Sequence, residues 1–162
     1  MSKRLKQAAV VFVVVLAAAQ FIRPDRTNPP TDASRTIDAH VGTGSELVAV
    51  LGRACSDCHS NATVWPWYSQ VAPVSWLMAY GVTKGRQAVN FSEWAAYSPE
   101  QRRILLAMSC DDATHGKMPG AYALLHPEMQ LSAKDVETIC VAARQTAASA
   151  AMDSAPQFRR ER

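Results

Sequence analysis

The chain has only a small excess of positive charge and few cysteines. The 162 residues carry a formal net charge of only +3. No run dense in lysine and arginine is interleaved with aromatic residues, which excludes nucleic acid as the expected partner. The four cysteines are too few for a small domain held together by disulfides, so each cysteine needs an interpretation of its own.

Strand patterns and internal repeats are also lacking. No segment has the convincing alternation of apolar and polar residues that is typical of a strand. The spacing of apolar residues instead predicts helices over residues 45–55, 74–86, 98–110 and 132–144. With a length of about one domain, the chain is predicted to form one small all-α domain.

A long apolar run occurs at the N-terminus. Residues 8–22 follow a basic start and are interrupted only by Gln20, as in an export signal or a membrane anchor. A helix of this length spans about 22 Å, which is short for a hydrocarbon core of about 30 Å. Cleavage after Ala19 is the alternative. Because the basic start stays in the cytoplasm, both interpretations place the rest of the chain outside it.

The chain after this segment divides into three parts. Residues 23–42 contain three prolines and no sustained apolar period, so we expect a linker. Residues 43–145 hold the predicted helices and form the expected domain. Residues 146–162 are rich in alanine and serine and then basic, which predicts a disordered tail.

The motif Cys55-x-x-Cys58-His59 is the strongest chemical signal. Thiols at this spacing can each add to a vinyl group of one porphyrin, and the next histidine then lies under the iron. We therefore predict one covalent haem c with His59 as an iron ligand. A zinc site is an alternative, but Cys110 and Cys140 do not form the second close pair that zinc usually requires. A redox-active cysteine pair would need a strand before it.

The second iron ligand is predicted to be Met118. Glycine and proline on both sides of it shape a loop that can hold a thioether in one place. Ligation by histidine and methionine raises the potential of haem iron and suits electron transfer. His115, His126 or an open position are the alternatives. Met78 and Met108 fall on apolar helical faces and are expected in the core.

Further residues are predicted around the haem. Trp65, Trp67 and Tyr68 stand in one short loop, where they would surround the haem and donate hydrogen bonds to its propionates, or form the core. Arg86 is a candidate partner for a propionate, because guanidinium groups pair with carboxylates, and a solvated helix end is the alternative.

Two cysteines are left over by the haem motif. Cys110 and Cys140 lie near the ends of two predicted helices, and unassigned cysteines in an oxidising compartment often pair. Their disulfide would brace the Met118 loop against the last helix. Two buried free thiols are the alternative.

Several blocks of sequence are together more specific than the haem motif. They are Gln-Phe-Ile-Arg-Pro-Asp-Arg-Thr-Asn-Pro from residue 20, Cys-Ser-Asp-Cys-His-Ser-Asn from 55, Trp-Pro-Trp-Tyr-Ser from 65, Val-Ala-Pro-Val-Ser-Trp from 71, Gly-Arg from 85, Asn-Phe-Ser-Glu-Trp from 90, Met-Pro from 118, and Tyr122 with His-Pro from 126. These blocks resemble the bacterial haem-binding domain family of cytochrome c-like proteins, over about residues 20–142. The resemblance implies a small helical periplasmic domain with one haem, often tethered by an N-terminal helix, and Met118 in the distal position. The last helix departs from the family pattern, because residues 141–144 lack the expected aromatic side chain.

The expected function is one-electron transfer at the outer face of a bacterial inner membrane, with redox proteins as partners. No acid–base pair or nucleophile calls for an enzymatic reaction. The alternatives are a haem-based sensor or peroxidase-like protein with an open sixth position, and a zinc-binding interaction module. The basic residues Arg159, Arg160 and Arg162 are either a docking site for an acidic partner or a solvated end.

Overall fold

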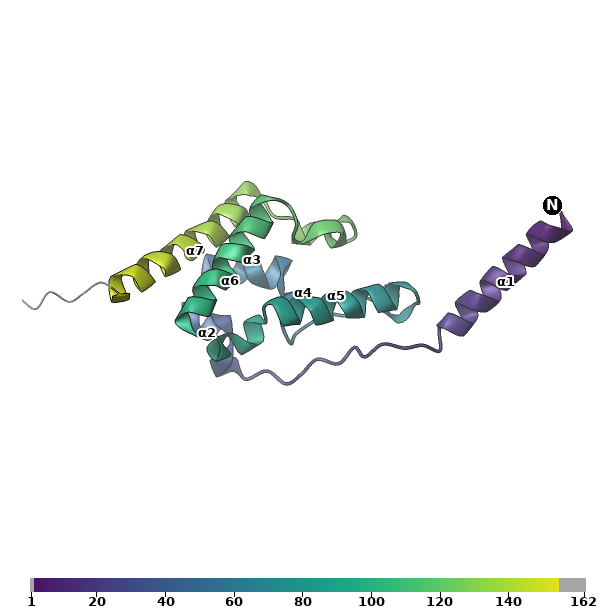
Figure 1. The fold of residues 1–162 in the computed structure, drawn as a ribbon, viewed down its shortest axis with the longest axis horizontal. Helices are drawn as coiled ribbons and strands as arrows, with labels where there is room; N and C mark the ends of the chain where they lie inside the picture. Colours follow the sequence, from purple (N-terminus) through teal and green to yellow (C-terminus); the bar gives the residue numbers. More distant parts are fainter. Residues whose placement is uncertain (1, 155–162) are drawn as a thin grey trace, which may run out of the picture.

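The computed structural model describes residues 2–154, and over them the chain is helical with no strand (Figure 1). The α-helices are α1 (Lys3–Ala19), α2 (Ile37–Val41), α3 (Glu46–Ala54), α4 (Ser56–His59), α5 (Val74–Ala88), α6 (Pro99–Thr114) and α7 (Ala133–Ser154). Short 3-10 helices lie between them: η1 (Ala33–Arg35), η2 (Trp67–Gln70), η3 (Phe91–Ala96), η4 (Gly120–Leu124) and η5 (Pro127–Met129). The expected all-α class is confirmed.

The helices begin where the sequence provides caps. The Ser45 hydroxyl accepts a hydrogen bond from the Val48 amide at the start of α3, over 3.3 Å. Ser98 and Gln101 form a reciprocal capping box at the start of α6, with proline in the first turn. These caps satisfy amide groups that would otherwise lack partners, and they fix the start of two helices around the core.

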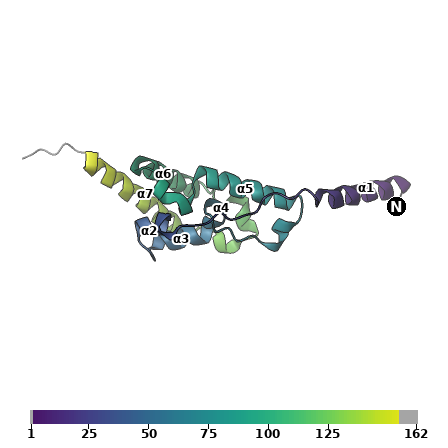
Figure 2. The same ribbon diagram turned by 90° about the horizontal axis from the view of Figure 1, so that it is seen from below.

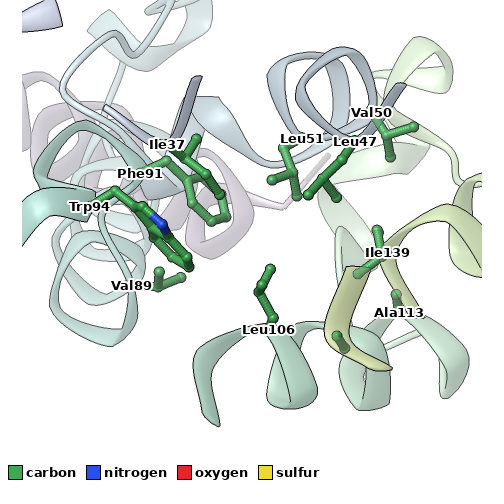
Figure 3. Packing of buried hydrophobic residues seen from close by; sticks show 11 residues of the cluster. Ile37, Leu47, Val50, Leu51, Val89, Phe91, Trp94, Leu106, Ala113 and Ile139 are labelled. Atoms are coloured by element: carbon green, nitrogen blue, oxygen red, sulfur yellow. The ribbon is translucent and has the colours of Figure 1, made fainter. Parts of the chain in front are cut away.

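The core lies between α3, α6, α7 and the segment that contains η3. Figure 3 shows Leu106 of α6 between the aromatic side chains of η3 and the apolar residues of α3. The buried cluster comprises Ile37, Leu47, Val50, Leu51, Val89, Phe91, Trp94, Leu106, Ala113, Ile139 and Ala143. The last helix thus packs through small and aliphatic side chains, without an aromatic residue.

Two of the expected boundaries differ in the structure. Ile37 belongs to the core and is only 3% exposed, so the predicted linker 23–42 is extended only as far as residue 32 and then joins the domain. The sequence did not predict that Ile37 is buried or that residues 33–41 contain two short helices, because a single apolar residue does not establish a periodic pattern. The predicted tail begins later than residue 146, since α7 continues to Ser154. The three basic tail residues lie outside the described residues.

Helix α1 extends away from the rest of the chain in both views (Figure 1, Figure 2). None of its side chains is buried. No helix within residues 2–154 combines the length and the apolar character needed to cross a membrane.

The extended segment after α1 is held against the aromatic loop by hydrogen bonds. Arg26 donates to the Ser69 carbonyl over 2.6 Å, and the Asn28 side-chain amide donates to the Thr63 carbonyl over 2.9 Å. Residues 23–32 are therefore tied to the domain although they form no helix.

Candidate functional site

Both thiols of the motif and the His59 ring line one cavity in the domain. The cavity lies between α4, α6, α7 and the loop that follows α6, and its polar surface is small. Its apolar walls include Leu51, Phe91, Leu105, Met129, Leu131 and Ile139. Side chains from distant parts of the sequence thus enclose the motif in a largely apolar environment.

The motif occupies the junction of α3 and α4. The Cys55 carbonyl accepts hydrogen bonds from the amides of Cys58 and His59, over 3.2 and 3.0 Å, which form the single turn of α4. Both thiols are free and half-buried. Burial raises the pKa of the Cys55 thiol to about 11, and burial beside Asp57 raises the pKa of Cys58. These thiols are neutral at pH 7, whereas a redox-active cysteine pair needs a lowered pKa.

The His59 ring is oriented by the backbone of the residue after α5. Its Nδ1 lies 3.2 Å from the Val89 carbonyl oxygen, and an Nδ1–H that donates there leaves Nε2 free to bind a metal ion. Burial lowers the pKa of His59, which favours the neutral ring that a ligand must have. The ring is also 6.1 Å from that of Phe91, between centroids.

Met118 lines the same cavity and is 47% exposed, so it reaches both the interior and the surface. Its loop turns at Gly116 and Gly120, where φ is +65° and +60°, values that favour glycine. Neither alternative histidine is among the cavity-lining residues: His115 contacts Asp111, and His126 contacts Glu128.

Two further methionines line the cavity. Met108, expected in the core, is 57% exposed at the edge of the cavity, because α6 turns this face toward the Met118 loop. Met129 is buried in the cavity wall and was missed, because the short helix η5 has no sequence period. Met78 is half-buried on α5 and is not among the lining residues.

The expected aromatic residues do not line the cavity. Trp67 is 79% exposed, and the indole N–H of Trp65 is buried without a hydrogen-bond partner among the described residues. The Tyr68 hydroxyl contacts Nε2 of His126. None of these three side chains is among the cavity-lining residues, and their expected contact with the haem stays a prediction.

A different aromatic side chain, Tyr122, lies at the cavity that contains the motif. It lines the cavity, its ring stacks on that of His126 with centroids 4.3 Å apart, and its hydroxyl is buried. This hydroxyl has no hydrogen-bond partner in the described part of the chain. Burial, together with the neighbouring Tyr68 hydroxyl, raises its pKa, so the phenol remains neutral. Tyr122 is among the residues that resemble the family, but the sequence alone did not indicate its place at this cavity.

Arg86 has a structural role instead of the expected contact with a propionate. Its guanidinium group donates to the carbonyls of Ser60 and Thr27, over 2.7 and 3.1 Å. It also donates to the side-chain oxygens of Asn28 and Thr63, over 2.8 and 2.9 Å. With these donors engaged and the side chain absent from the cavity lining, Arg86 joins the extended N-terminal segment to the loop after the motif.

Cys110 and Cys140 form a disulfide that joins α6 to α7, with their Cα atoms 4.9 Å apart. Because both helices contribute to the cavity, the bond holds two of its walls together. It also leaves neither sulfur available as a zinc ligand, and no cluster of three metal-binding side chains occurs within the described residues.

The residues that meet here fit a haem group. Free thiols can form thioether bonds to the porphyrin, while an oriented neutral imidazole and a thioether can bind its iron. The unpartnered Tyr122 hydroxyl can donate to a propionate. A family model described as "Haem-binding domain" matches residues 14–145 of the chain. No curated protein and no solved structure matches it.

Proposed function

The chain belongs to the haem-binding domain family, and from this premise we propose that it is a c-type cytochrome that transfers single electrons. The observation that carries the proposal is the meeting of Cys55, Cys58, His59 and Met118 at one largely apolar cavity. Bound haem supplies a single iron that changes between its ferric and ferrous states. The proposed stoichiometry of one haem follows from the single motif of this kind in the sequence.

Each residue of the site has a defined task in this proposal. The thiols of Cys55 and Cys58 would hold the porphyrin covalently, and His59 would bind the iron through Nε2. The Val89 carbonyl holds the opposite ring nitrogen, which fixes the ring orientation and increases the basicity of the ligand. The apolar walls exclude water, and this burial together with the axial ligands sets the potential.

Met118 distinguishes an electron carrier from a haem protein with an open position. A thioether from Met118 would be a second protein ligand to the iron and would exclude a small molecule from it. The same side chain is 47% exposed, so the edge of the site reaches the protein surface, where a redox protein can approach. We propose redox proteins as the partners on this basis.

We further propose that the protein works on the periplasmic side of a bacterial inner membrane. The basic start followed by an apolar segment supports export, with residues 7–22 as an anchor or as a cleaved signal. The disulfide between Cys110 and Cys140 also supports an oxidising compartment, since such bonds are rare in the cytosol.

Absorption spectra of the purified holoprotein test the proposed ligation. We expect a sharp α-band after reduction and, in the ferric form, the charge-transfer band of an iron–thioether bond. In Met118→Ala this band should disappear while the covalent haem remains. The matched control is Met78→Ala, which changes a methionine outside the cavity lining and should keep the band.

Two results would contradict the proposal. Loss of the band in Met108→Ala but not in Met118→Ala would transfer the ligand role to the other exposed methionine of the cavity. A broad high-spin spectrum of the unaltered protein that shifts with carbon monoxide would indicate an open position and favour a sensor or peroxidase-like function.

A further inference from the structure

One end of the domain is built from a stretch of sequence without charge. Residues 60–83 contain no aspartate, glutamate, lysine, arginine or histidine, although this stretch includes exposed loops and the exposed side of α5. Long exposed stretches of soluble domains normally carry charges, so the composition of this surface requires a physical explanation.

Large apolar side chains are exposed at this end. Leu77 is 71% exposed and Tyr80 is 63% exposed, one turn apart on α5. Trp67 is 79% exposed on the neighbouring helix η2, and Phe21 is 88% exposed just after α1. We call Phe21, Ile22, Trp67, Val71, Leu77 and Tyr80 the apolar end. Such a surface marks a site of interaction.

The apolar end is joined to the end of helix α1. The Gln20 side-chain amide donates to the Ala72 carbonyl over 3.2 Å, and the Ala72 amide donates to the Gln20 side-chain oxygen over 3.0 Å. The Trp76 indole N–H donates to the Ile22 carbonyl over 2.7 Å. In both views the start of α5 lies beside the end of α1 (Figure 1, Figure 2).

Helix α1 has the same character as this surface. Residues 8–19 contain no charged or polar side chain, and Val10, Phe12 and Val14 are each about 60% exposed. A helix that is apolar on all sides is covered by a protein core or by lipid. The described residues cover none of its side chains. The apolar surface of α1 therefore continues into the apolar end of the domain through Phe21 and Ile22, and Arg23 is the next charged residue.

We propose that the apolar end rests on a lipid bilayer, with Trp67 and Tyr80 at the level of the headgroups. Tryptophan and tyrosine favour this region because each ring has an apolar body and a polar group. Arg23 follows Ile22 and can meet anionic headgroups, whereas the Arg26 guanidinium group is held by the Ser69 carbonyl. This inference rests on the proposed location at a membrane and adds which face of the domain contacts it.

Spin labelling of the full-length holoprotein in vesicles of phosphatidylethanolamine and phosphatidylglycerol tests this surface. Leu77→Cys places a label on the apolar end, and Glu137→Cys places the control label on an exposed face of α7. With the haem reduced, we expect the Leu77 label to be more accessible to oxygen than to a water-soluble nickel chelate. The Glu137 label should show the opposite order.

A third label, Val13→Cys on α1, separates the possible failures. If the Val13 label is in lipid but the Leu77 label resembles the Glu137 label, the domain stands away from the bilayer and the inference is overturned. If the Val13 label is also in water, the proposed membrane location fails together with it, while the haem spectra still test the electron-transfer proposal. Spin–spin broadening at Leu77 that disappears on dilution with unlabelled protein would assign the surface to a second copy and overturn the inference.

Discussion

Gly85 lies where helix α5 passes the haem motif at very short range. A Cβ atom at this position would be 2.3 Å from the Cys58 carbonyl oxygen and 2.8 Å from its carbon. Both atoms belong to the backbone of α4, so they cannot move aside as a flexible side chain could. The absence of a side chain at Gly85 therefore allows α5 to support the segment that presents Cys58 and His59 to the cavity.

We expect Gly85→Ala to destabilise the protein by about 1–3 kcal/mol, the usual range for overpacking, and to lower the yield of covalent haem. Urea unfolding and haem staining of a denaturing gel measure the two effects. Gly81→Ala on the same helix is the matched control, because nothing lies within 4 Å of its added Cβ. It should be neutral or stabilising by up to about 1 kcal/mol, since alanine favours helix. Equal behaviour of the two variants would refute this role of Gly85.

At the scale of helices, Asp135 links the start of α7 to α3. Its carboxylate accepts hydrogen bonds from the Ser132 amide and hydroxyl, both over 2.8 Å, and forms an ion pair with Arg53 over 2.9 Å. Arg53 also donates to the carbonyls of Glu128 and Gln130. The Asp135 carboxylate thus joins α3, which contributes Leu51 to the cavity, to α7, which contributes Ile139.

The hydrogen bonds from Ser132, more than the ion pair with Arg53, lower the pKa of Asp135 below its ordinary value of 3.8. A carboxylate with a lowered pKa in the folded state stabilises the protein above the unfolded value, and this contribution is lost as the pH falls through the folded value. We expect Asp135→Asn to lower the free energy of unfolding at pH 7 by about 1 kcal/mol, the usual cost of a lost helix cap. The melting temperature should fall accordingly.

Thermal unfolding between pH 3 and pH 7 checks this prediction. The difference between Asp135→Asn and the unaltered protein should become smaller as the pH falls below 3.8, because the unfolded carboxylate is protonated first and the native one follows at its lower pKa. Glu137→Gln, an exposed change on the same helix, is the control and should shift the melting temperature little. A difference that stays constant over the whole range would show that the charge of Asp135 is not responsible.

At the scale of the whole molecule, the disulfide encloses the second half of the haem site. Cys110 and Cys140 are separated by 30 residues, and Met118, Tyr122, Met129 and Leu131 of the cavity wall lie between them. The crosslink therefore restricts a segment that contains three short loops and the 3-10 helices η4 and η5.

We expect Cys110→Ala combined with Cys140→Ala to lower the free energy of unfolding by roughly 3–4 kcal/mol, the loop entropy for this separation. Covalent haem should remain, because the motif cysteines are untouched, but the iron–thioether band should disappear at a lower temperature than before. Urea unfolding and ferric spectra during heating measure both effects. A reductant should weaken the unaltered protein in the same way and leave the double variant unchanged. Failure of either comparison would contradict the proposed bracing role.

The sequence by itself determined those features that depend on neighbouring residues. The spacing of Cys55, Cys58 and His59 is local, so one turn of backbone suffices to bring them together. The caps at Ser45 and Ser98 act within a single helical turn and marked the helix starts correctly. The glycine-shaped loop around Met118 could be found for the same reason.

Only the tertiary structure decided which distant side chains complete the site. Tyr122 and Met129 enter the cavity, Trp67 points to the surface, and Arg86 binds backbone carbonyls, although all are equally plausible from the sequence. Their roles depend on which faces α5, α6 and α7 turn toward α4. Those orientations result from the simultaneous packing of the whole core and the close contact at Gly85, and no short segment of sequence contains that information.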